Sequence, residues 1–265
     1  AEKAEDDAAR AAGKPLANHP WKPLPASYEP ASLYNGMIAP LTPLAIKGFL
    51  WYQGETNSSP DRVPYYSALM TGLIRDWRKH FAQGNLPFLF VQISSFSSPD
   101  ERWGALRDQQ RRVLATAGTA MAVSLDVGLA DNVHPPDKQT VAARLALAAR
   151  NMVYGEKVAY EGPMFRQVTT ERDSSGAPAL RVWFDHGEGL SFHGQPAFGF
   201  EIAGEDHIFV AATAHIEGPS VAVTASGIAE PRYVRFAFSS VVTSSLYNSV
   251  GLPASTFTSE PLSIR

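Results

Sequence analysis

Three short apolar runs, each followed by a segment with helical periodicity, limit most strongly how this chain folds. In chain order these strand-like and helix-like segments lie at residues 46–52, 66–81, 86–93, 103–114, 119–127 and 141–152. In the helix-like segments the apolar residues recur at three- and four-residue steps, which gives each helix one apolar face. Strands that alternate with helices predict a parallel sheet covered by helices, so the fold class of this part is α/β.

The pattern on either side of this α/β part is different. After Gly155 come short alternating strands separated by Gly, Pro and Asp turns, at residues 180–184, 207–216, 220–225 and 233–238. This spacing predicts a small β-sandwich or jelly roll. At the other end, residues 1–14 predict an Ala-rich charged helix that stops at Gly13, and a Pro-rich tether follows it. We therefore expect a helix and linker over 1–30, the α/β domain over 31–156 and a C-terminal β-sandwich domain over 157–265.

The composition excludes several functions. The 265 residues carry a formal net charge of -3, which gives no electrostatic footprint for nucleic acid. Cys is absent, which excludes disulfides, thiolate nucleophiles and Cys-based metal sites. No apolar run approaches the roughly 20 residues that span a bilayer, and the polar start does not resemble a signal peptide. We expect neither a nucleic acid nor a membrane as partner.

Two of the loops that follow the expected strands carry reactive side chains. In a parallel sheet such loops meet at the carboxyl edge, where ligands bind. After the first strand comes Trp51-Tyr52-Gln53-Gly54-Glu55. The Gly permits close approach of the backbone to a ligand, the Gln offers a donor and the Glu a carboxylate. Aromatic residues at a strand end form a sugar platform less often than they pack in the core.

The loop after the third strand, residues 126–136, contains Asp131 and His134. An Asp three residues before a His can accept the imidazole N–H and stabilise the imidazolium that forms when the ring takes a proton. An Asp and a His at this spacing also occur in ordinary helix-entry turns and in structural hydrogen-bond networks. The pattern alone leaves catalytic and structural roles open.

Five segments of the chain resemble one known family. They are Leu33-Tyr34-Asn35-Gly36-Met37-Ile38, the stretch GFLWYQGETN over 48–57, Asp131-Asn132-Val133-His134-Pro135, GFEIAG over 199–204 and LYNSVGLPAS over 246–255. This combination resembles the sialate O-acetylesterase family of SGNH-type serine hydrolases, which are related to acetylxylan esterases. The resemblance implies a flavodoxin-like parallel sheet and a carboxylic ester hydrolase that removes acetyl groups from sugars with no cofactor and no metal. It also implies a secreted or periplasmic protein, or a lysosomal one in a eukaryote.

The resemblance also implies roles for individual residues. His134 is the general base that activates a serine and then protonates the leaving sugar oxygen. Its acid partner is Asp131 or Glu55, and the sequence does not choose between them. Gln53 and Gly54 are expected to face the developing oxyanion. Asn35 lines the same pocket or closes a turn before Gly36.

The catalytic serine of the family has no counterpart in this sequence. Family members carry it in a Gly-Gln-Ser-Asn block on the first strand, and no such block is present. The serines at 94, 95, 97, 98 and 220 do not resemble a nucleophile elbow. We interpret the group over 94–98 as a solvated loop that satisfies backbone groups, and Ser220 as part of a turn. We therefore expect 31–156 to be a partial SGNH domain without its first strand, with the serine on a missing N-terminal segment or a companion N-terminal polypeptide.

Two other functions fit parts of the pattern. A non-catalytic carbohydrate-binding or scaffolding fragment agrees with the β-rich part and the missing serine. It gives no reason for an oriented imidazole beside Gln-Gly-Glu. A two-carboxylate glycosidase would need Glu55 and Asp131 to face each other across roughly 5 to 9.5 Å, and it leaves His134 without a necessary role.

Overall fold

The computed structural model describes residues 2–15, 29–173, 176–194, 196–242 and 245–261, in two compact units. The first unit comprises residues 1–44 with 80–82. It holds helix α1 (Glu2–Ala11) and two short turns, η2 (Tyr34–Ile38) and η3 (Ala39–Leu41). The expected N-terminal helix is thus present, whereas residues 16–28 of the expected linker lie outside the described part. The second unit, residues 45–79 with 83–265, contains all of the sheets.

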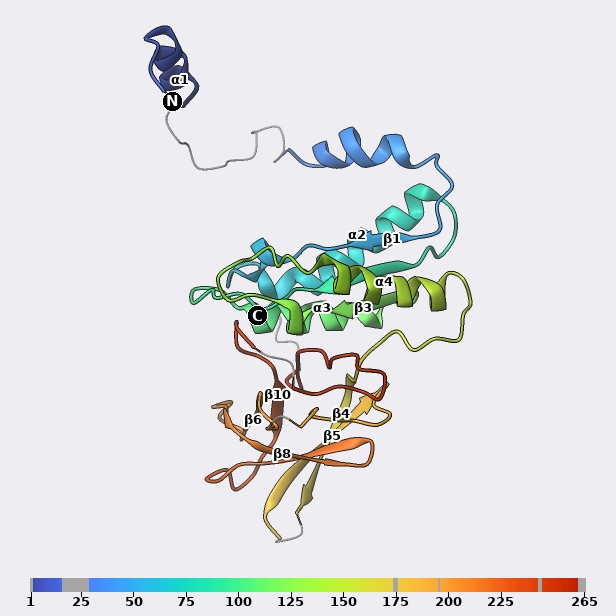
Figure 1. Ribbon diagram of the computed structural model, residues 1–265, viewed down its shortest axis with the longest axis vertical. Helices are drawn as coiled ribbons and strands as arrows, with labels where there is room; N and C mark the ends of the chain where they lie inside the picture. Colours follow the sequence, from blue (N-terminus) through green and yellow to red (C-terminus); the bar gives the residue numbers. More distant parts are fainter. Residues whose placement is uncertain (1, 16–28, 174–175, 195, 243–244, 262–265) are drawn as a thin grey trace. The chain divides into compact units, whose positions relative to one another are not determined.

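A parallel sheet of three strands forms the start of the second unit (Figure 1). The strands are β1 (Phe49–Trp51), β2 (Phe88–Gln92) and β3 (Thr119–Val123), in the order β1-β2-β3. Phe88 is paired with Phe49 on one side and with Thr119 on the other. Each strand is shorter than the apolar run that predicted it, and after β3 the polypeptide turns at once. This turn is the 3-10 segment η7 (Leu125–Val127).

Two helices cover one face of this sheet. Helix α2 (Tyr66–Phe81) places Trp77 against Phe49 and Phe88, with ring centroids 5.3 and 6.2 Å away. Helix α3 (Trp103–Arg112) accepts a hydrogen bond at the Arg107 carbonyl from Gln92 Nε2, at 2.9 Å. Because Phe88 and Gln92 are an even number of residues apart on β2, they point to the same face, and so both helices lie on that face.

The opposite face is covered by helix α4 (Lys138–Met152) only in part. Ala148 of α4 packs with Leu89 and Ala120, which belong to β2 and β3. Leu50 of β1 pairs in register with Leu89 and so points to the same face, yet it is 68% exposed. Among the described residues β1 pairs with β2 alone. Strand β1 therefore has one unpaired edge and one uncovered face.

The rest of the second unit is built of antiparallel strands, drawn in yellow to red in Figure 1. One sheet has the order β4-β5-β9-β8 and the other the order β11-β10-β6-β7. The strands are β4 (Met164–Arg172), β5 (Pro178–Asp185), β6 (Phe200–Ala203), β7 (Val210–Ala211), β8 (Thr213–Glu217), β9 (Ser220–Thr224), β10 (Tyr233–Phe236) and β11 (Phe257–Thr258). Phe165 of the first sheet stacks on Phe257 of the second, with their ring centroids 4.6 Å apart. The expected α/β part followed by a β-rich part is confirmed.

Two details of the β-rich part differ from the sequence-based expectation. The single strand expected over 207–216 is divided into β7 and β8, which belong to different sheets. The backbone of His207 is left-handed, with φ 59°, so no strand begins there, and β7 starts only at Val210. Strand β4 was not expected, because most of its residues are polar and at least partly exposed and give no apolar alternation.

Candidate active site

Contacts between the loops that leave β1, β2 and β3 bring them together at the carboxyl edge of the sheet. A Cβ on Gly128 would lie 2.3 Å from the Ser95 nitrogen, so the loop after β3 lies directly against the loop after β2. The Ser97 N–H also donates to the Ala130 carbonyl at 2.9 Å. Lys138, at the start of α4, lies over the ring of Tyr52 with its Nζ 5.0 Å from the centroid. The two loops singled out in the sequence therefore belong to one edge.

The Gln53-Gly54-Glu55 segment is held from the side of helices α2 and α3. The Gln53 carbonyl accepts hydrogen bonds from the Tyr66 hydroxyl at 3.0 Å and from Gln110 Nε2 at 3.1 Å. Gly54 lies so close to α3 that a Cβ there would be 2.8 Å from Gln110 Nε2. A side chain at this point would have to displace the Gln110 amide, and the backbone φ of 159° also favours Gly. Glu55 then begins the 3-10 segment η4 (Glu55–Ser58).

Two tyrosines near Glu55 stay protonated over a wide pH range. Burial raises the pKa of Tyr52 above its ordinary value, and the nearby Glu55 carboxylate adds to the rise. The pKa of Tyr66 is raised for the same two reasons, burial first. The Tyr66 hydroxyl therefore remains a donor at neutral pH.

Trp51 lies in an aromatic cluster with Trp77 and Phe88, with ring centroids 5.8 and 6.1 Å away. This is the position expected of a core residue.

His134 and Asp131 lie in the loop after β3, and both are exposed. The backbone N–H of His134 donates to Asn132 Oδ1 at 2.9 Å, which fixes the turn before the ring. Among the described residues the histidines in ion pairs are His186 and His207, and His134 is in neither pair. The choice of Asp131 or Glu55 as acid partner therefore stays open.

The beginning of the His134 loop is anchored by a pair of side chains that the sequence analysis did not single out. The Arg144 guanidinium of α4 donates two hydrogen bonds to the Asp126 carboxylate, at 2.7 and 2.6 Å. It also donates to the Val123 carbonyl at 2.7 Å. Both side chains are largely buried. A signal was present, because Arg144 falls at helical spacing between Val141 and Ala148 on the buried face of α4.

Two of the serines that were weighed as nucleophiles, Ser95 and Ser220, form hydrogen bonds with the backbone. Ser95 is buried, and its Oγ donates to the Val242 carbonyl at 2.6 Å and accepts from the Val242 N–H at 3.1 Å. Ser220 is also buried and donates to the Glu217 carbonyl at 2.8 Å. The interpretation of 94–98 as a solvated loop is wrong for Ser94 and Ser95, which are 5% and 3% exposed. A segment of the β-rich part covers them.

Asn35 belongs to the first unit, whereas Gln53 and His134 belong to the second. It lies in the turn η2, is exposed, and donates its backbone N–H to the Ala31 carbonyl at 2.8 Å. Any residue other than Pro at this position of the turn would make that backbone bond, so the turn-closing role weighed for Asn35 stays a prediction. A role in lining the substrate pocket stays a prediction.

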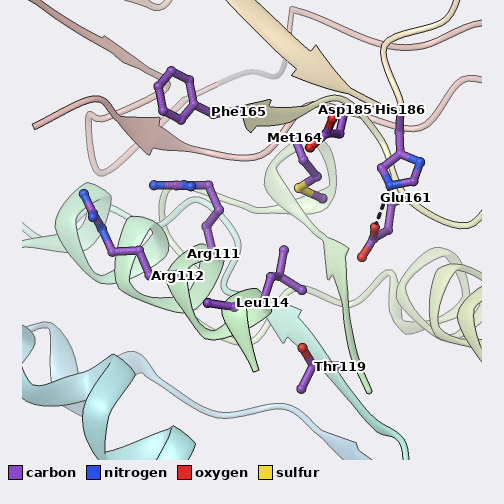
Figure 2. Close-up of a pocket in the computed structure, with 10 residues that line it drawn as sticks. Arg111, Arg112, Leu114, Thr119, Glu161, Met164, Phe165, Asp185 and His186 are labelled. Carbon is purple, nitrogen blue, oxygen red and sulfur yellow. Dashed lines mark ion pairs between the residues drawn. The ribbon is translucent and has the colours of Figure 1, made fainter. Parts of the chain in front are cut away.

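A cavity of about 490 Å³ lies away from this edge (Figure 2). Thr119, at the amino end of β3, is one of its lining residues, so the cavity is at the opposite end of the sheet. Figure 2 shows Arg111 and Arg112 of α3 on one side and the Glu161–His186 ion pair on the other. His186 Nε2 and Glu161 Oε2 are 3.1 Å apart. This cavity is not the candidate active site, because none of the loops at the carboxyl edge of the sheet lines it.

Across the part of the chain that the structure describes, no helix combines the length and the apolar character needed to cross a bilayer.

The helix-covered parallel sheet, with reactive loops gathered at its carboxyl edge and two antiparallel sheets following it, defines an SGNH-like α/β enzyme fold with a β-rich part. Residues 10–151 match the family model described as SASA, carbohydrate esterase, sialic acid-specific acetylesterase. The chain belongs to this family, as the resemblance of its motifs predicted.

Individual relatives agree with the family match. The chain is 38% identical to the sialate O-acetylesterase of Mus musculus over 157 residues, 51% of this chain and 29% of that protein. It is 38% identical to the one of Homo sapiens over 153 residues, 50% of this chain and 29% of that protein. A solved carbohydrate acetylesterase from Xanthomonas citri superposes with a TM-score of 0.81 at 37% identity, over 86% of this chain and 53% of that one. The chain thus spans less than a third of the curated relatives and about half of the solved one.

Proposed function

We propose that this chain carries the general-base side of a carbohydrate O-acetylesterase, which hydrolyses acetyl esters on sugars such as sialic acids or acetylated xylan. The observation that carries the proposal is that the Gln53-Gly54-Glu55 loop and the His134 loop leave the same edge of the sheet, where Lys138 lies over Tyr52, in a chain of the SASA family. The relatives, a sialate O-acetylesterase and a carbohydrate acetylesterase, support this substrate class. The family also supports a secreted, periplasmic or lysosomal location.

The chemistry follows from the exposed imidazole of His134. As general base it takes the proton of a serine hydroxyl while the serine oxygen bonds to the acetyl carbon, and the carbonyl oxygen becomes negative. The Gly54 N–H stabilises this oxyanion, together with the second hydrogen of the Gln53 amide, whose Nε2 also donates to Asn57 Oδ1 at 2.7 Å. The imidazolium then gives its proton to the departing sugar oxygen, which leaves an acetyl-enzyme. Water, activated by His134, releases acetate and restores the serine.

We propose that the serine comes from residues outside this sequence, either a preceding segment or a companion polypeptide. Ser95 and Ser220 are buried and bonded to backbone groups, so neither is available as a nucleophile. Strand β1 offers a place for the missing strand, because its outer edge is unpaired among the described residues and Leu50 is exposed. A parallel strand docked there would end at the same edge as the His134 loop.

The test combines acetate release with native mass spectrometry of the purified protein. We expect an O-acetylated sugar to be hydrolysed when a polypeptide with a Gly-Gln-Ser-Asn segment is attached to or associated with this chain. His134→Ala should then lower kcat by about 10²- to 10⁴-fold, the usual contribution of a general base. The same assay identifies the acid partner of His134. We expect one of the variants Asp131→Asn and Glu55→Gln to lower kcat strongly with little change in KM, and the residue changed in that variant is the partner. Activity that survives His134→Ala would refute the proposal.

The hydrogen bonds of Ser95 and Ser220 to the backbone also favour a second candidate, a non-catalytic carbohydrate-binding protein. This candidate predicts a chain with no serine-bearing companion that binds an acetylated sugar without releasing acetate. The same mass spectra and acetate measurements therefore separate the two functions.

A further inference from the structure

A single carbonyl in the candidate site is held by two buried side chains from two different helices. The Gln53 carbonyl receives the Tyr66 hydroxyl of α2 at 3.0 Å and the Gln110 amide of α3 at 3.1 Å. Tyr66 is 4% exposed and Gln110 is fully buried. Donors from two directions fix the carbonyl in space, and because the peptide group is planar they fix the whole Gln53–Gly54 peptide plane.

The orientation of this plane decides where the next N–H points. In a trans peptide the carbonyl and the following N–H point in opposite directions. With the Gln53 carbonyl turned toward α2 and α3, the Gly54 N–H is turned away from both helices. Gly54 is buried, and its N–H donates to none of the described residues. Because no acceptor in the described part of the protein competes for it, this N–H can donate to an acceptor on a ligand.

We infer that Gln110 and Tyr66 are positioning residues for the esterase, which aim the Gly54 N–H at the oxyanion of the reacting acetyl group. This inference rests on the proposed function. Gln110 is tied to the sheet by its other end, because its Oε1 accepts the Ile93 N–H at 2.9 Å. It thereby couples the end of β2 to the peptide after β1.

The sharpest variant is Gln110→Glu, which is nearly isosteric. It keeps an oxygen for the Ile93 N–H but replaces the donating Nε2 by a carboxylate oxygen that repels the Gln53 carbonyl. A lost oxyanion donor costs about 10²- to 10³-fold in kcat, so a donor that is only misaimed should cost about 10- to 100-fold, with KM nearly unchanged. Tyr66→Phe, which removes one of the two hydrogen bonds, should cost about fivefold.

The neighbouring residue supplies a matched control. Gln109 lies on the same helix and is 8% exposed, and its Oε1 accepts the Ser67 N–H at 3.3 Å. Gln109→Glu therefore introduces the same charge and keeps its acceptor without contact to Gln53. Its kcat should stay within twofold of the unmodified enzyme. The pH profile gives a second readout: the ratio of kcat between Gln110→Glu and Gln109→Glu should rise toward one at low pH, because a protonated carboxyl again donates to the Gln53 carbonyl.

A measurement that needs no activity completes the test. The amide resonance of Gly54 should shift, and its hydrogen exchange accelerate, in Gln110→Glu but not in Gln109→Glu. An unchanged Gly54 amide, or a kcat of Gln110→Glu within twofold of that of Gln109→Glu, would overturn the inference. An unmodified enzyme that releases no acetate would instead overturn the proposed function, and the Gly54 amide would still report whether the two side chains fix the peptide.

Discussion

The loop that carries His134 depends on one charged contact with α4. Arg144 and Asp126 are joined by two hydrogen bonds of 2.7 and 2.6 Å, and their side chains are 10% and 19% exposed. A second Arg on the same helix, Arg150, contacts Glu156 at 2.6 Å with side chains that are 49% and 45% exposed. The two pairs have similar lengths and differ mainly in burial.

This difference gives a prediction. Arg144→Met should lower the free energy of unfolding by about 3 kcal/mol, because it leaves Asp126 buried without its partner. Arg150→Met should cause no measurable loss, because water screens the exposed pair. Urea unfolding of both variants provides the measurement, and equal losses would show that burial does not control the strength of these contacts.

The sequence predicted the position of the candidate loops better than it predicted the side chains that hold them. Glu55 and His134 follow strands, and strand order alone brings such loops to one edge. Gln110 and Arg144 lie inside helices, where a polar residue usually faces solvent. Their helical spacing placed both on apolar faces, but spacing does not reveal which carbonyl or carboxylate a buried polar side chain reaches.

At the scale of elements, α3 approaches the backbone just after β10 without a side chain between them. A Cβ on Gly104 would lie 1.8 Å from the Phe238 carbonyl oxygen, whereas a Cβ on Gly72, in α2, would meet nothing within 4 Å. Because both glycines lie within helices, the main difference between them is the space around each one.

Gly104→Ala should therefore destabilise the protein by about 3 kcal/mol, the upper range for overpacking. Gly72→Ala should stabilise it by about 1 kcal/mol, because Ala is the better helix former. Thermal or urea unfolding of the two variants measures the contrast. A tolerated Gly104→Ala would mean that helix and loop can separate without loss of stability.

Element boundaries show which signals in the sequence were reliable. Helix α2 runs over Tyr66–Phe81, as its periodicity predicted, because one apolar face and Pro64 define it. The strand expected over 207–216 was not a single element, because pairing partners that are distant in the sequence assign β7 and β8 to different sheets. Local pattern describes a helix well, whereas a strand also depends on its neighbours.

At the scale of the whole molecule, the Glu161–His186 pair joins the segment after α4 to the end of β5. Glu161 Oε1 also accepts the Met121 N–H of β3 at 3.4 Å. The hydrogen bond to Glu161 raises the pKa of His186 above its ordinary value, and the charges of Asp185 and Glu188 add to the rise against the effect of burial.

A pKa raised in the folded state means that the pair stabilises the protein fully below the unfolded pKa of about 6.5 and less as the pH rises through the folded pKa. The melting temperature of His186→Asn should therefore fall below that of the unmodified protein near pH 5, and the gap should narrow above neutrality. Asn tolerates the left-handed backbone of His186, φ 57°, so the variant reports on charge. His215→Asn, at an exposed position of β8, is the control. A gap that does not change with pH would refute the assignment.

Residues 240–242 of the β-rich part reach across to the loop that follows β2. The Phe96 N–H donates to the Ser240 carbonyl, the Ser240 hydroxyl donates to the Ser98 carbonyl, and Ser95 is bonded to Val242 in both directions. Substitutions in the β-rich part can therefore reshape the rim of the candidate site while His134 and Glu55 stay the same. A chimera that borrows this part from a relative would have to bring a matching 240–242 segment, or the rim would lose its support. In a library built to alter sugar preference, this segment is the place to randomise first.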